Sequence, residues 1–270
     1  MTSLKLRSKS DSVRLLQELL SKAGYQVDID GNFGKQTDKA VKDFQRKNNL
    51  VVDGVVGTKT WIKLNAVLPD EIKNTEGKLL SEKDLQNLAD ELGIELAAVK
   101  AVNEVESSGR GFLTSGKPKI LFEGHIFWNR LKVHGLNPPD FTTGNEDVLY
   151  PKWTKEFYKG GEKEYDRLNR AKAIHESAAL ESASWGIFQI MGYHYKITGY
   201  NSVQEYVDAM YKSEGNHLKA FGKFIQSQGL AKHLKNKDWA KFAKGYNGAG
   251  YKLNKYDEKL AAAYKKYRTP

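Results

Sequence analysis

Two glutamates, Glu104 and Glu106, lie near the end of a segment with helical periodicity. Glu106 shares a helix face with Val102 and Val99, one and two turns before it. Glu104 lies about 200° around the helix from Glu106, since each residue turns the helix by about 100°. It follows Lys100 by one turn. We therefore expect Glu104 to be a solvated surface acid with a weak ion pair, and Glu106 to face apolar surroundings.

Glu106 has the surroundings of a general acid. An apolar face and a helix C-terminus both disfavour the charged carboxylate, so they predict a raised pKa for Glu106. A carboxyl group that keeps its proton near neutral pH can donate it to a leaving oxygen, which accelerates bond cleavage by about 10²–10⁴-fold. The structural alternative is a helix-terminal glutamate whose carboxylate is satisfied by the hydroxyls of Ser107 and Ser108.

Other common catalytic groups are not indicated. The chain has no cysteine, which excludes disulfides, thiolate metal sites and a cysteine nucleophile. Its six histidines show neither a His-x₃-His spacing nor a His-Glu-x-x-His motif, so the sequence does not predict a zinc site. Because no Gly-x-Ser-x-Gly motif or phosphate-binding loop occurs either, we expect no metal and no cofactor.

Three short blocks carry a family resemblance. They are Glu106–Gly109 (Glu-Ser-Ser-Gly), Ser184–Gly192 (Ser-Trp-Gly-Ile-Phe-Gln-Ile-Met-Gly) and Gly245–Gly248 (Gly-Tyr-Asn-Gly). In this order they resemble the catalytic glutamate, the Gly-x-x-Gln loop and the Tyr-Asn loop of the lysozyme superfamily. More narrowly, Val105–Phe112 followed by Ile120–Glu123 is similar to the phage-type N-acetylmuramidase domain found in modular endolysins.

The resemblance implies that Glu106 protonates the leaving oxygen of a glycosidic bond. A glycosidase commonly needs a second carboxylate. We favour Glu123, because the Leu-Phe-Glu segment of the resembled family carries a candidate partner at this place. Glu176 and Glu181 are the other candidates, and they cannot share a helix face at a spacing of five residues, so at most one enters the site. The structural alternative for Glu123 is a bridge to His125 or Arg130.

Four further residues are expected to bind substrate. Gln189 offers two donors and an acceptor to a sugar N-acetyl group. Trp185 is predicted to stack on a sugar ring, with burial in the core as the alternative. Tyr246 and Asn247 resemble the Tyr-Asn pair that places a phenol and an amide beside the scissile bond, with a tight turn as the alternative.

The elements that must position these residues are mainly helical. Ser81 is expected to cap a helix that ends at Gly93, and a second helix covers residues 97–107. Residues 112–123 are the exception and are predicted to form a short β-hairpin. We therefore predict a mainly α chain whose C-terminal domain, residues 81–270, has a lysozyme-like α+β fold with a small β-hairpin.

Residues 1–68 contain an internal echo. Asp30–Thr37 (Asp-Gly-Asn-Phe-Gly-Lys-Gln-Thr) is followed, at an offset of 23 residues, by Asp53–Thr60 (Asp-Gly-Val-Val-Gly-Thr-Lys-Thr). Each copy is a turn with two glycines that leads into a helix. The resulting three-helix unit closely resembles a peptidoglycan-binding domain of cell-wall hydrolases, which implies bacterial peptidoglycan as a partner. The glycines, the aspartates and Trp61 are expected to serve turns and core. Residues 69–80 are polar and aperiodic, which predicts a linker.

The formal net charge of +10 favours an anionic partner. Basic residues are interspersed with acids and no nucleic-acid motif occurs, so peptidoglycan is favoured over nucleic acid. No apolar run approaches the roughly 18 residues of a membrane span, and the first seven residues lack the apolar stretch of a secretory signal. We expect a monomer that is synthesised in a host cytoplasm and acts on the cell wall after membrane permeabilisation.

These observations predict a phage-type endolysin that hydrolyses the β-1,4 bond between N-acetylmuramic acid and N-acetylglucosamine. Glu106 is the predicted general acid, and Glu123 activates or stabilises the attacking water. A lytic transglycosylase is the nearest alternative, since it keeps the fold, uses one glutamate as acid and then base, and leaves a 1,6-anhydro product. A catalytically inactive wall-binding or phage structural protein is another, and a nucleic-acid binder is the most distant.

Overall fold

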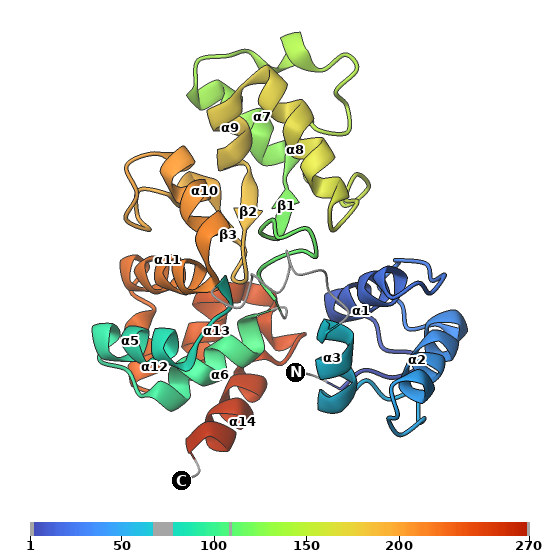
Figure 1. Ribbon diagram of the computed structural model, residues 1–270. Coiled ribbons are helices and arrows are strands. Elements are labelled where there is room, and N and C mark those ends of the chain that lie inside the picture. The colour runs from blue at the N-terminus through green and yellow to red at the C-terminus, as the bar shows by residue number, and fades with distance from the viewer. Residues whose placement is uncertain (1–2, 67–77, 108–109, 269–270) are drawn as a thin grey trace. The chain divides into compact units, whose positions relative to one another are not determined.

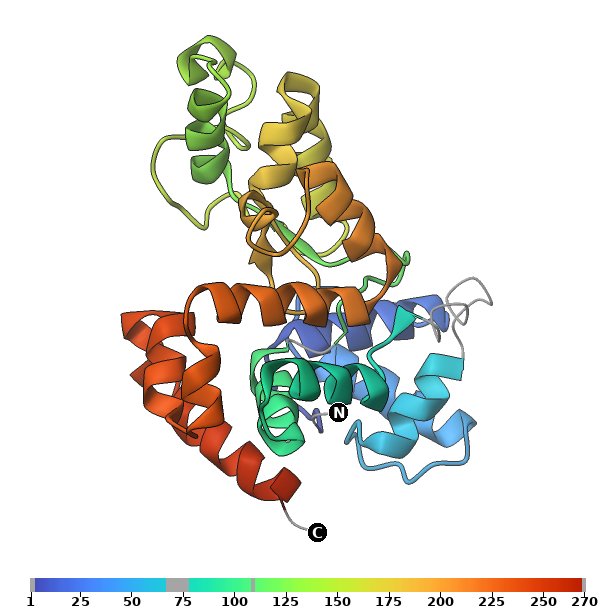
Figure 2. The same cartoon turned by 90° about the vertical axis from the view of Figure 1, so that its left-hand side faces the viewer.

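The computed structural model describes residues 3–66, 78–107 and 110–268 (Figures 1 and 2). The chain divides into two compact units, residues 1–77 with 113–117 and residues 78–112 with 118–270. Each unit has a hydrophobic core of its own. Most of the predicted linker, together with Ser108 and Gly109, lies outside the described residues.

Three helices form the described part of the smaller unit, as the periodicity predicts. They are α1 (Asp11–Lys22), α2 (Lys35–Lys47) and α3 (Thr58–Ala66). The hydroxyl of Ser10 caps α1 by accepting a hydrogen bond from the amide of Val13 (3.3 Å). The buried core draws on all three helices and includes Leu16, Leu20, Val41, Phe44, Trp61 and Leu64.

The two echoed turns are held by the same set of contacts. The side-chain amide of Gln17 donates to Asp30 Oδ1 (2.8 Å) and to the Thr37 hydroxyl (3.2 Å). Its Oε1 accepts from the amide of Gly31 (2.8 Å), whose φ of 77° favours glycine. The second turn repeats these contacts with Gln45, Asp53, Thr60 and Gly54. The glycines and aspartates of the echo therefore serve the turns.

The larger unit is mainly helical. Helix α5 (Glu82–Leu92) begins at a capping box of Ser81 and Asp84 and ends at Gly93, whose φ is 61°. It leads into α6 (Leu96–Glu106), so Glu106 is the last helical residue. The remaining helices are α7 (Gly124–Val133), η2 (Pro138–Phe141), α8 (Lys163–Ile174), α9 (Glu176–Glu181), η3 (Gly192–His194), α10 (Val203–Lys212), α11 (Glu214–Ser227), α12 (Ala231–Lys235), α13 (Trp239–Asn247), η4 (Ala249–Lys252) and α14 (Tyr256–Arg268). None of the described helices is both long enough and apolar enough to cross a membrane.

A small antiparallel sheet of three strands, ordered β1-β2-β3, accompanies these helices (Figure 1). The strands are β1 (Ile120–Phe122), β2 (Ala183–Trp185) and β3 (Ile190–Met191). Ile120 lies opposite Trp185, which lies opposite Ile190 on its other side. This confirms the predicted fold class, a mainly α chain with a small β element.

The predicted hairpin over residues 112–123 is wrong in its pairing. Phe112 pairs with Pro118 in an isolated bridge, flanked by hydrogen bonds from the amide of Leu113 to the carbonyl of Lys117 (2.8 Å) and from the amide of Lys119 to the carbonyl of Gly111 (2.7 Å). This local pairing does not extend to β1, which pairs with β2. The hairpin is formed instead by β2 and β3, which the Gly-x-x-Gln turn connects.

Helix α14 packs along α6, the helix that ends at Glu106. Leu260 and Ala263 of α14 are buried. The two helices are also joined at the surface, where Lys266 pairs with Glu104 (2.6 Å). The basic segment of residues 256–268 is therefore a helix packed on α6.

Candidate active site

Glu106 ends α6 in half-buried surroundings. Val99 and Val102, on the face that the sequence assigns to Glu106, lie in the core. The side-chain amide of Asn247 donates to Glu106 Oε1 over 2.9 Å. Burial raises the pKa of the Glu106 carboxyl, and the hydrogen bond from Asn247 and the charge of Lys259 oppose this rise in part. A raised pKa is what a general acid needs near neutral pH.

Asn247 and Tyr246 reach this place from the end of α13. The Tyr246 hydroxyl donates to the carbonyl oxygen of Phe188 (3.0 Å), and its ring stacks on Phe242 with an interplanar angle of 11°. Burial raises the pKa of Tyr246, and the nearby charge of Glu106 adds to the rise. Since Phe188 belongs to the Gly-x-x-Gln turn, these contacts bring the three sequence blocks together.

The Gly-x-x-Gln turn uses its polar groups internally. Gln189 has a φ of 50°, its Oε1 accepts from the Ser184 hydroxyl (2.8 Å), and its Nε2 donates to the carbonyl of Gly186 (2.7 Å). Trp185 is 1% exposed, and its indole N–H donates to the carbonyl of Leu180 (3.1 Å). The predicted sugar contacts of both residues therefore find no support here. The Gln189 amide closes the turn, and Trp185 belongs to the core because it lies on the middle strand of the sheet.

Glu214 of α11 fixes the loop that follows Glu106. Its buried carboxylate accepts from the amides of Gly111 (2.6 Å) and Leu80 (2.8 Å). Burial raises the pKa of Glu214, while these two amides and the nearby charge of Arg110 lower it. The loop after the helix end is thus tied to a second helix, which Figure 2 shows as the long orange one.

His217, one turn further along α11, lies between that loop and the Gly-x-x-Gln turn. Its Nε2 donates to the carbonyl of Met210 (2.7 Å), so its Nδ1 can accept from the amide of Ile187 (3.2 Å). A Cβ atom at either Gly111 or Gly186 would lie 2.6 Å from Nδ1. Burial lowers the pKa of His217 to about 4, so the ring is neutral at neutral pH.

Sequence reasoning did not identify Glu214 and His217. The available signal was the pair Gly111 and Gly186, because a glycine beside a chemical motif can mark a close approach of another side chain. The sequence alone does not say which side chain that is. His217 follows Gly186 by 31 residues in the sequence, and only the packing of α11 brings its ring to this glycine.

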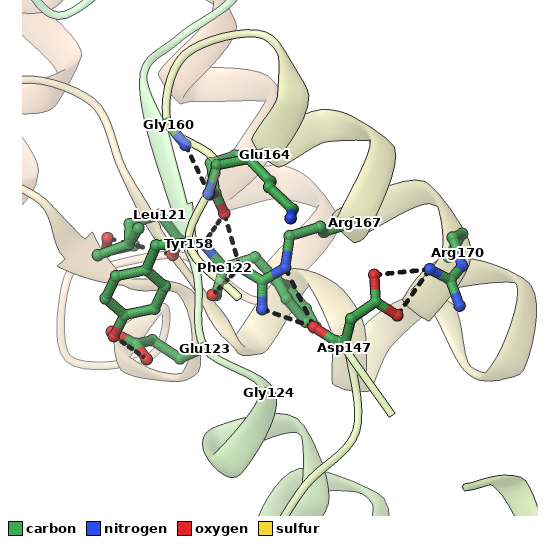
Figure 3. A network of polar contacts seen from close by, with 12 residues as sticks. Leu121, Phe122, Glu123, Gly124, Asp147, Tyr158, Gly160, Glu164, Arg167 and Arg170 are labelled. Carbon is green, nitrogen blue, oxygen red and sulfur yellow. Dashed lines mark hydrogen bonds and ion pairs between the residues drawn. The ribbon is translucent and has the colours of Figure 1, made fainter. Parts of the chain in front are cut away.

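Glu123 precedes α7 and has a network of its own (Figure 3). The Tyr158 hydroxyl lies 2.8 and 2.7 Å from its two carboxylate oxygens, and His125 Nδ1 lies 3.3 Å from Oε2. Burial raises the pKa of Glu123, whereas Tyr158, His125 and Arg167 oppose the rise. Among the described residues, no hydrogen bond or ion pair joins Glu123 to Glu106.

A buried ion pair holds the segment that carries Tyr158 (Figure 3). Arg167 Nη1 lies 2.9 Å from Glu164 Oε2, and both side chains are almost fully buried. Glu164 also accepts from the backbone amides of residues 159–160 (2.6 and 2.9 Å). The Arg167 guanidinium donates to the carbonyl of Phe122 (2.9 Å) and lies over the ring of Tyr158. Removing either charge would leave the other buried and unpaired, so the pair fixes both β1 and Tyr158.

Glu104 is a surface acid, as predicted, but with other partners. Its Oε2 lies 2.6 Å from Lys266 Nζ and 2.5 Å from the Tyr267 hydroxyl, both on α14. Lys100, the predicted partner, pairs with Glu82. Contacts with α14 thus replace the ion pair that was expected within α6.

The alternative second carboxylates are engaged elsewhere. Glu176 pairs with Lys172 (2.9 Å) at the surface. Glu181 is buried and contacts Arg130 (2.7 Å) and His134 (3.0 Å), so Arg130 does not bridge to Glu123. Within the described part of the chain, no group of three or more His, Asp or Glu side chains is arranged to hold a metal ion.

Comparisons with known proteins agree with this geometry. Residues 95–268 match the N-acetylmuramidase family, and residues 9–64 match a family of peptidoglycan binding domains. The crystal structure of the Burkholderia AP3 phage endolysin is similar, with 42% identity and a TM-score of 0.71 over 98% of this chain and 99% of that one.

A curated relative matches only in part. An uncharacterized protein in the bpoA1 3′ region of Kitasatospora aureofaciens is 46% identical over 57 residues, which are 20% of this chain. They are 48% of that protein, so the match spans about half of its length. The muramidase match covers most of the chain, including Glu106, Glu123 and Asn247. The chain therefore belongs to the N-acetylmuramidase family and carries a peptidoglycan-binding domain ahead of its muramidase domain.

Proposed function

We propose that this protein is an endolysin that hydrolyses the β-1,4 bond between N-acetylmuramic acid and N-acetylglucosamine in bacterial peptidoglycan. The observation that carries the proposal is the half-buried Glu106 carboxyl at the end of α6, with a raised pKa and an amide donor from Asn247. A carboxyl group in such surroundings can hold a proton and pass it to the glycosidic oxygen as the C–O bond breaks.

Glu123 is the proposed second carboxylate, acting in its charged form. It receives a hydrogen bond from the Tyr158 hydroxyl and the electrostatic influence of His125 and Arg167, whereas Glu106 receives a neutral amide from Asn247 and the charge of Lys259. Environments that differ in this way favour the proton on Glu106 and the charge on Glu123. As a carboxylate, Glu123 can take a proton from water or stabilise positive charge at the anomeric carbon.

Binding of the wall is assigned to the smaller unit. The family match over residues 9–64 and the net charge of +10 support contact with peptidoglycan and its anionic groups. The resemblance to a phage endolysin over nearly the whole chain supports action on the cell wall of a bacterial host.

The test is a product analysis of peptidoglycan digested by the wild type, Glu106→Gln and Glu123→Gln. We expect muropeptides with reducing N-acetylmuramic acid ends from the wild type, identified by mass spectrometry after borohydride reduction. Each substitution should lower the rate by about 10²-fold or more, the contribution of a positioned acid or base. Glu104→Gln is the matched control, since it removes a surface carboxylate from the same helix.

Two outcomes would contradict the proposal. Products with 1,6-anhydro ends would make the protein a lytic transglycosylase, in which Glu106 acts as both acid and base. Equal activity of the wild type and Glu106→Gln, with both proteins folded, would mean that Glu106 is not the acid.

A further inference from the structure

Trp153 is the most exposed tryptophan of the chain, with 58% of its surface accessible. By contrast, Trp61 and Trp185 are buried, and Trp128 and Trp239 are half-buried. A single exposed apolar side chain is common on protein surfaces and needs no explanation by itself. What distinguishes Trp153 is its position beside the Glu123 network.

The indole of Trp153 lies close to Tyr158. Burial and the contact with Glu123 raise the pKa of the Tyr158 hydroxyl, whereas side-chain hydrogen bonding from Trp153 lowers it. The same hydroxyl lies 2.7 and 2.8 Å from the two oxygens of Glu123. The exposed ring is therefore separated from the second carboxylate by one side chain.

The segment that presents Trp153 is held at both ends. On one side, Tyr150 is buried and its ring packs against Phe157 with a centroid distance of 5.1 Å. On the other, Glu164 binds the backbone amides of residues 159–160. A ring on such a fixed segment loses little conformational entropy when it contacts a ligand.

We propose that Trp153 is a stacking platform for a sugar ring of the glycan strand, adjacent to the bond that Glu106 and Glu123 attack. The proposal rests on the proposed function and adds a binding site to it. One face of a pyranose in a β-1,4 glycan presents C–H groups, and a flat apolar indole packs against such a face while its N–H remains available to polar neighbours. Lys155 Nζ lies over the ring, 5.6 Å from its centre, so an ammonium group covers one face and the sugar stacks on the other.

The first test measures binding without cleavage, in the Glu106→Gln background. The probe is peptide-free glycan strand purified from peptidoglycan, titrated by calorimetry. We expect an additional Trp153→Ala change to weaken binding by about tenfold, a typical effect of truncating a tryptophan at a binding surface. Trp153→Phe should restore most of the affinity, since an aromatic face remains.

The matched control is Val133→Ala. Val133 is 65% exposed and lies at the opposite end of α7 from Glu123, so its truncation removes exposed apolar surface from the same region without touching the proposed platform. We expect its affinity to stay within about twofold of the parent. Equal affinities of the Trp153→Ala and Val133→Ala proteins, with unchanged circular dichroism, would overturn the proposal.

The second test separates stacking from a merely structural role. In the otherwise wild-type enzyme, Trp153→Ala should raise KM with kcat largely retained, because a platform binds ground state and transition state alike. A shifted pH profile of kcat at unchanged KM would mean that Trp153 acts only by positioning Tyr158, which would also overturn the proposal. A Trp153-dependent KM combined with full activity of Glu106→Gln would instead contradict the proposed function and leave the platform supported.

Discussion

At the scale of single residues, Glu106 and Glu123 are two half-buried carboxyl groups with different polar and charged neighbours. Both pKa values are raised by burial. At Glu123 a hydrogen bond from the Tyr158 hydroxyl counteracts the rise, and at Glu106 a hydrogen bond from the Asn247 amide does so. The division of labour between acid and base can therefore be tested by changing the neighbours and leaving both glutamates in place.

Tyr158→Phe is the most direct change of this kind. The hydroxyl lowers the pKa of Glu123, so its loss should raise that pKa. If Glu123 works as a carboxylate, the acidic limb of the kcat profile against pH should move to higher pH. Steady-state kinetics from pH 4 to pH 8 measure the shift.

Tyr267→Phe is the control for that experiment. It removes a similar hydroxyl that bonds to Glu104 at the surface, and its profile should match the wild type. A Tyr158→Phe profile that also matches would show that ionised Glu123 is not required in this pH range.

Sequence reasoning identified Glu106 and its apolar face, and it grouped Asn247 with Glu106 through the resemblance. It assigned sugar contacts to Gln189 and Trp185, whose side chains are used within the turn and the core. Glutamine and tryptophan are compatible both with sugar binding and with structural roles in a turn or a core. What decides between them is the pairing of β1 with β2, which makes β2 the middle strand and joins distant segments that local patterns do not specify.

At the scale of elements, α11 connects the loop after Glu106 with the Gly-x-x-Gln turn through Glu214 and His217. The contact at Gly186 is unusually close, because a Cβ atom there would lie 2.6 Å from His217 Nδ1, and its φ is 72°. Gly186→Ala should destabilise the protein by about 2 kcal/mol or more, through both backbone strain and overpacking.

Gly199→Ala separates the two causes. Gly199 also has a positive φ, of 93°, but no atom lies within 4 Å of the position of its Cβ. Only the strain contribution, about 1 kcal/mol, is expected there. Urea unfolding of the two variants measures the difference, and equal losses would mean that the approach of His217 contributes nothing.

His217 also predicts a pH dependence of stability. Its pKa is about 4 in the folded protein against 6.5 for an ordinary histidine, so between these values the unfolded state binds more protons. The stability that His217 contributes through its neutral ring is complete above pH 6.5 and is lost as the pH falls to about 4, by about 3 kcal/mol.

The pH dependence of the unfolding free energy must be compared between the wild type and a variant. The raised pKa values of Glu106, Glu123 and Glu214 make stability fall as the pH rises, which is opposite to the effect of His217. The loss of unfolding free energy from pH 7 to pH 4.5 should be smaller in His217→Gln than in the wild type. A His217→Gln protein with an unchanged slope would contradict the prediction.

Sequence patterns predicted the helix between Ser81 and Gly93 because its apolar spacing and caps are local. The prediction of a hairpin over residues 112–123 was wrong in its pairing for a physical reason. Its strands are too short for alternation to specify a partner. The local pairing is limited to the bridge between Phe112 and Pro118, and β1 pairs with a strand that follows α9.

At the scale of the whole molecule, two units with separate cores divide the proposed work. Residues 78–270 contain all the proposed active-site residues. This fragment should retain the rate on soluble glycan strands but act more slowly on intact sacculi, because it lacks the domain matched to peptidoglycan binding. Turbidity clearance and a soluble-product assay measure the two activities. Equal slowing on both substrates would show that the smaller unit supports the fold of the larger one.

The internal echo made the smaller unit the most predictable part of the chain. Its two turns have the same glutamine, aspartate, glycine and threonine contacts, so the same residue pattern appears twice in the sequence. The larger unit has no such repetition, and its site depends on contacts between segments far apart in the chain, such as Asn247 with Glu106.

The packing of α14 on α6 has a consequence for how the protein matures. The helix that carries Glu106 is translated long before residues 256–268, yet its face toward α14 stays uncovered until those residues arrive. The packing around α6 is therefore completed only after α14 has left the ribosome. A chain terminated before Tyr256 would expose this face of α6 and become a substrate for quality-control proteases. Production of folded protein is thereby tied to the synthesis of α14.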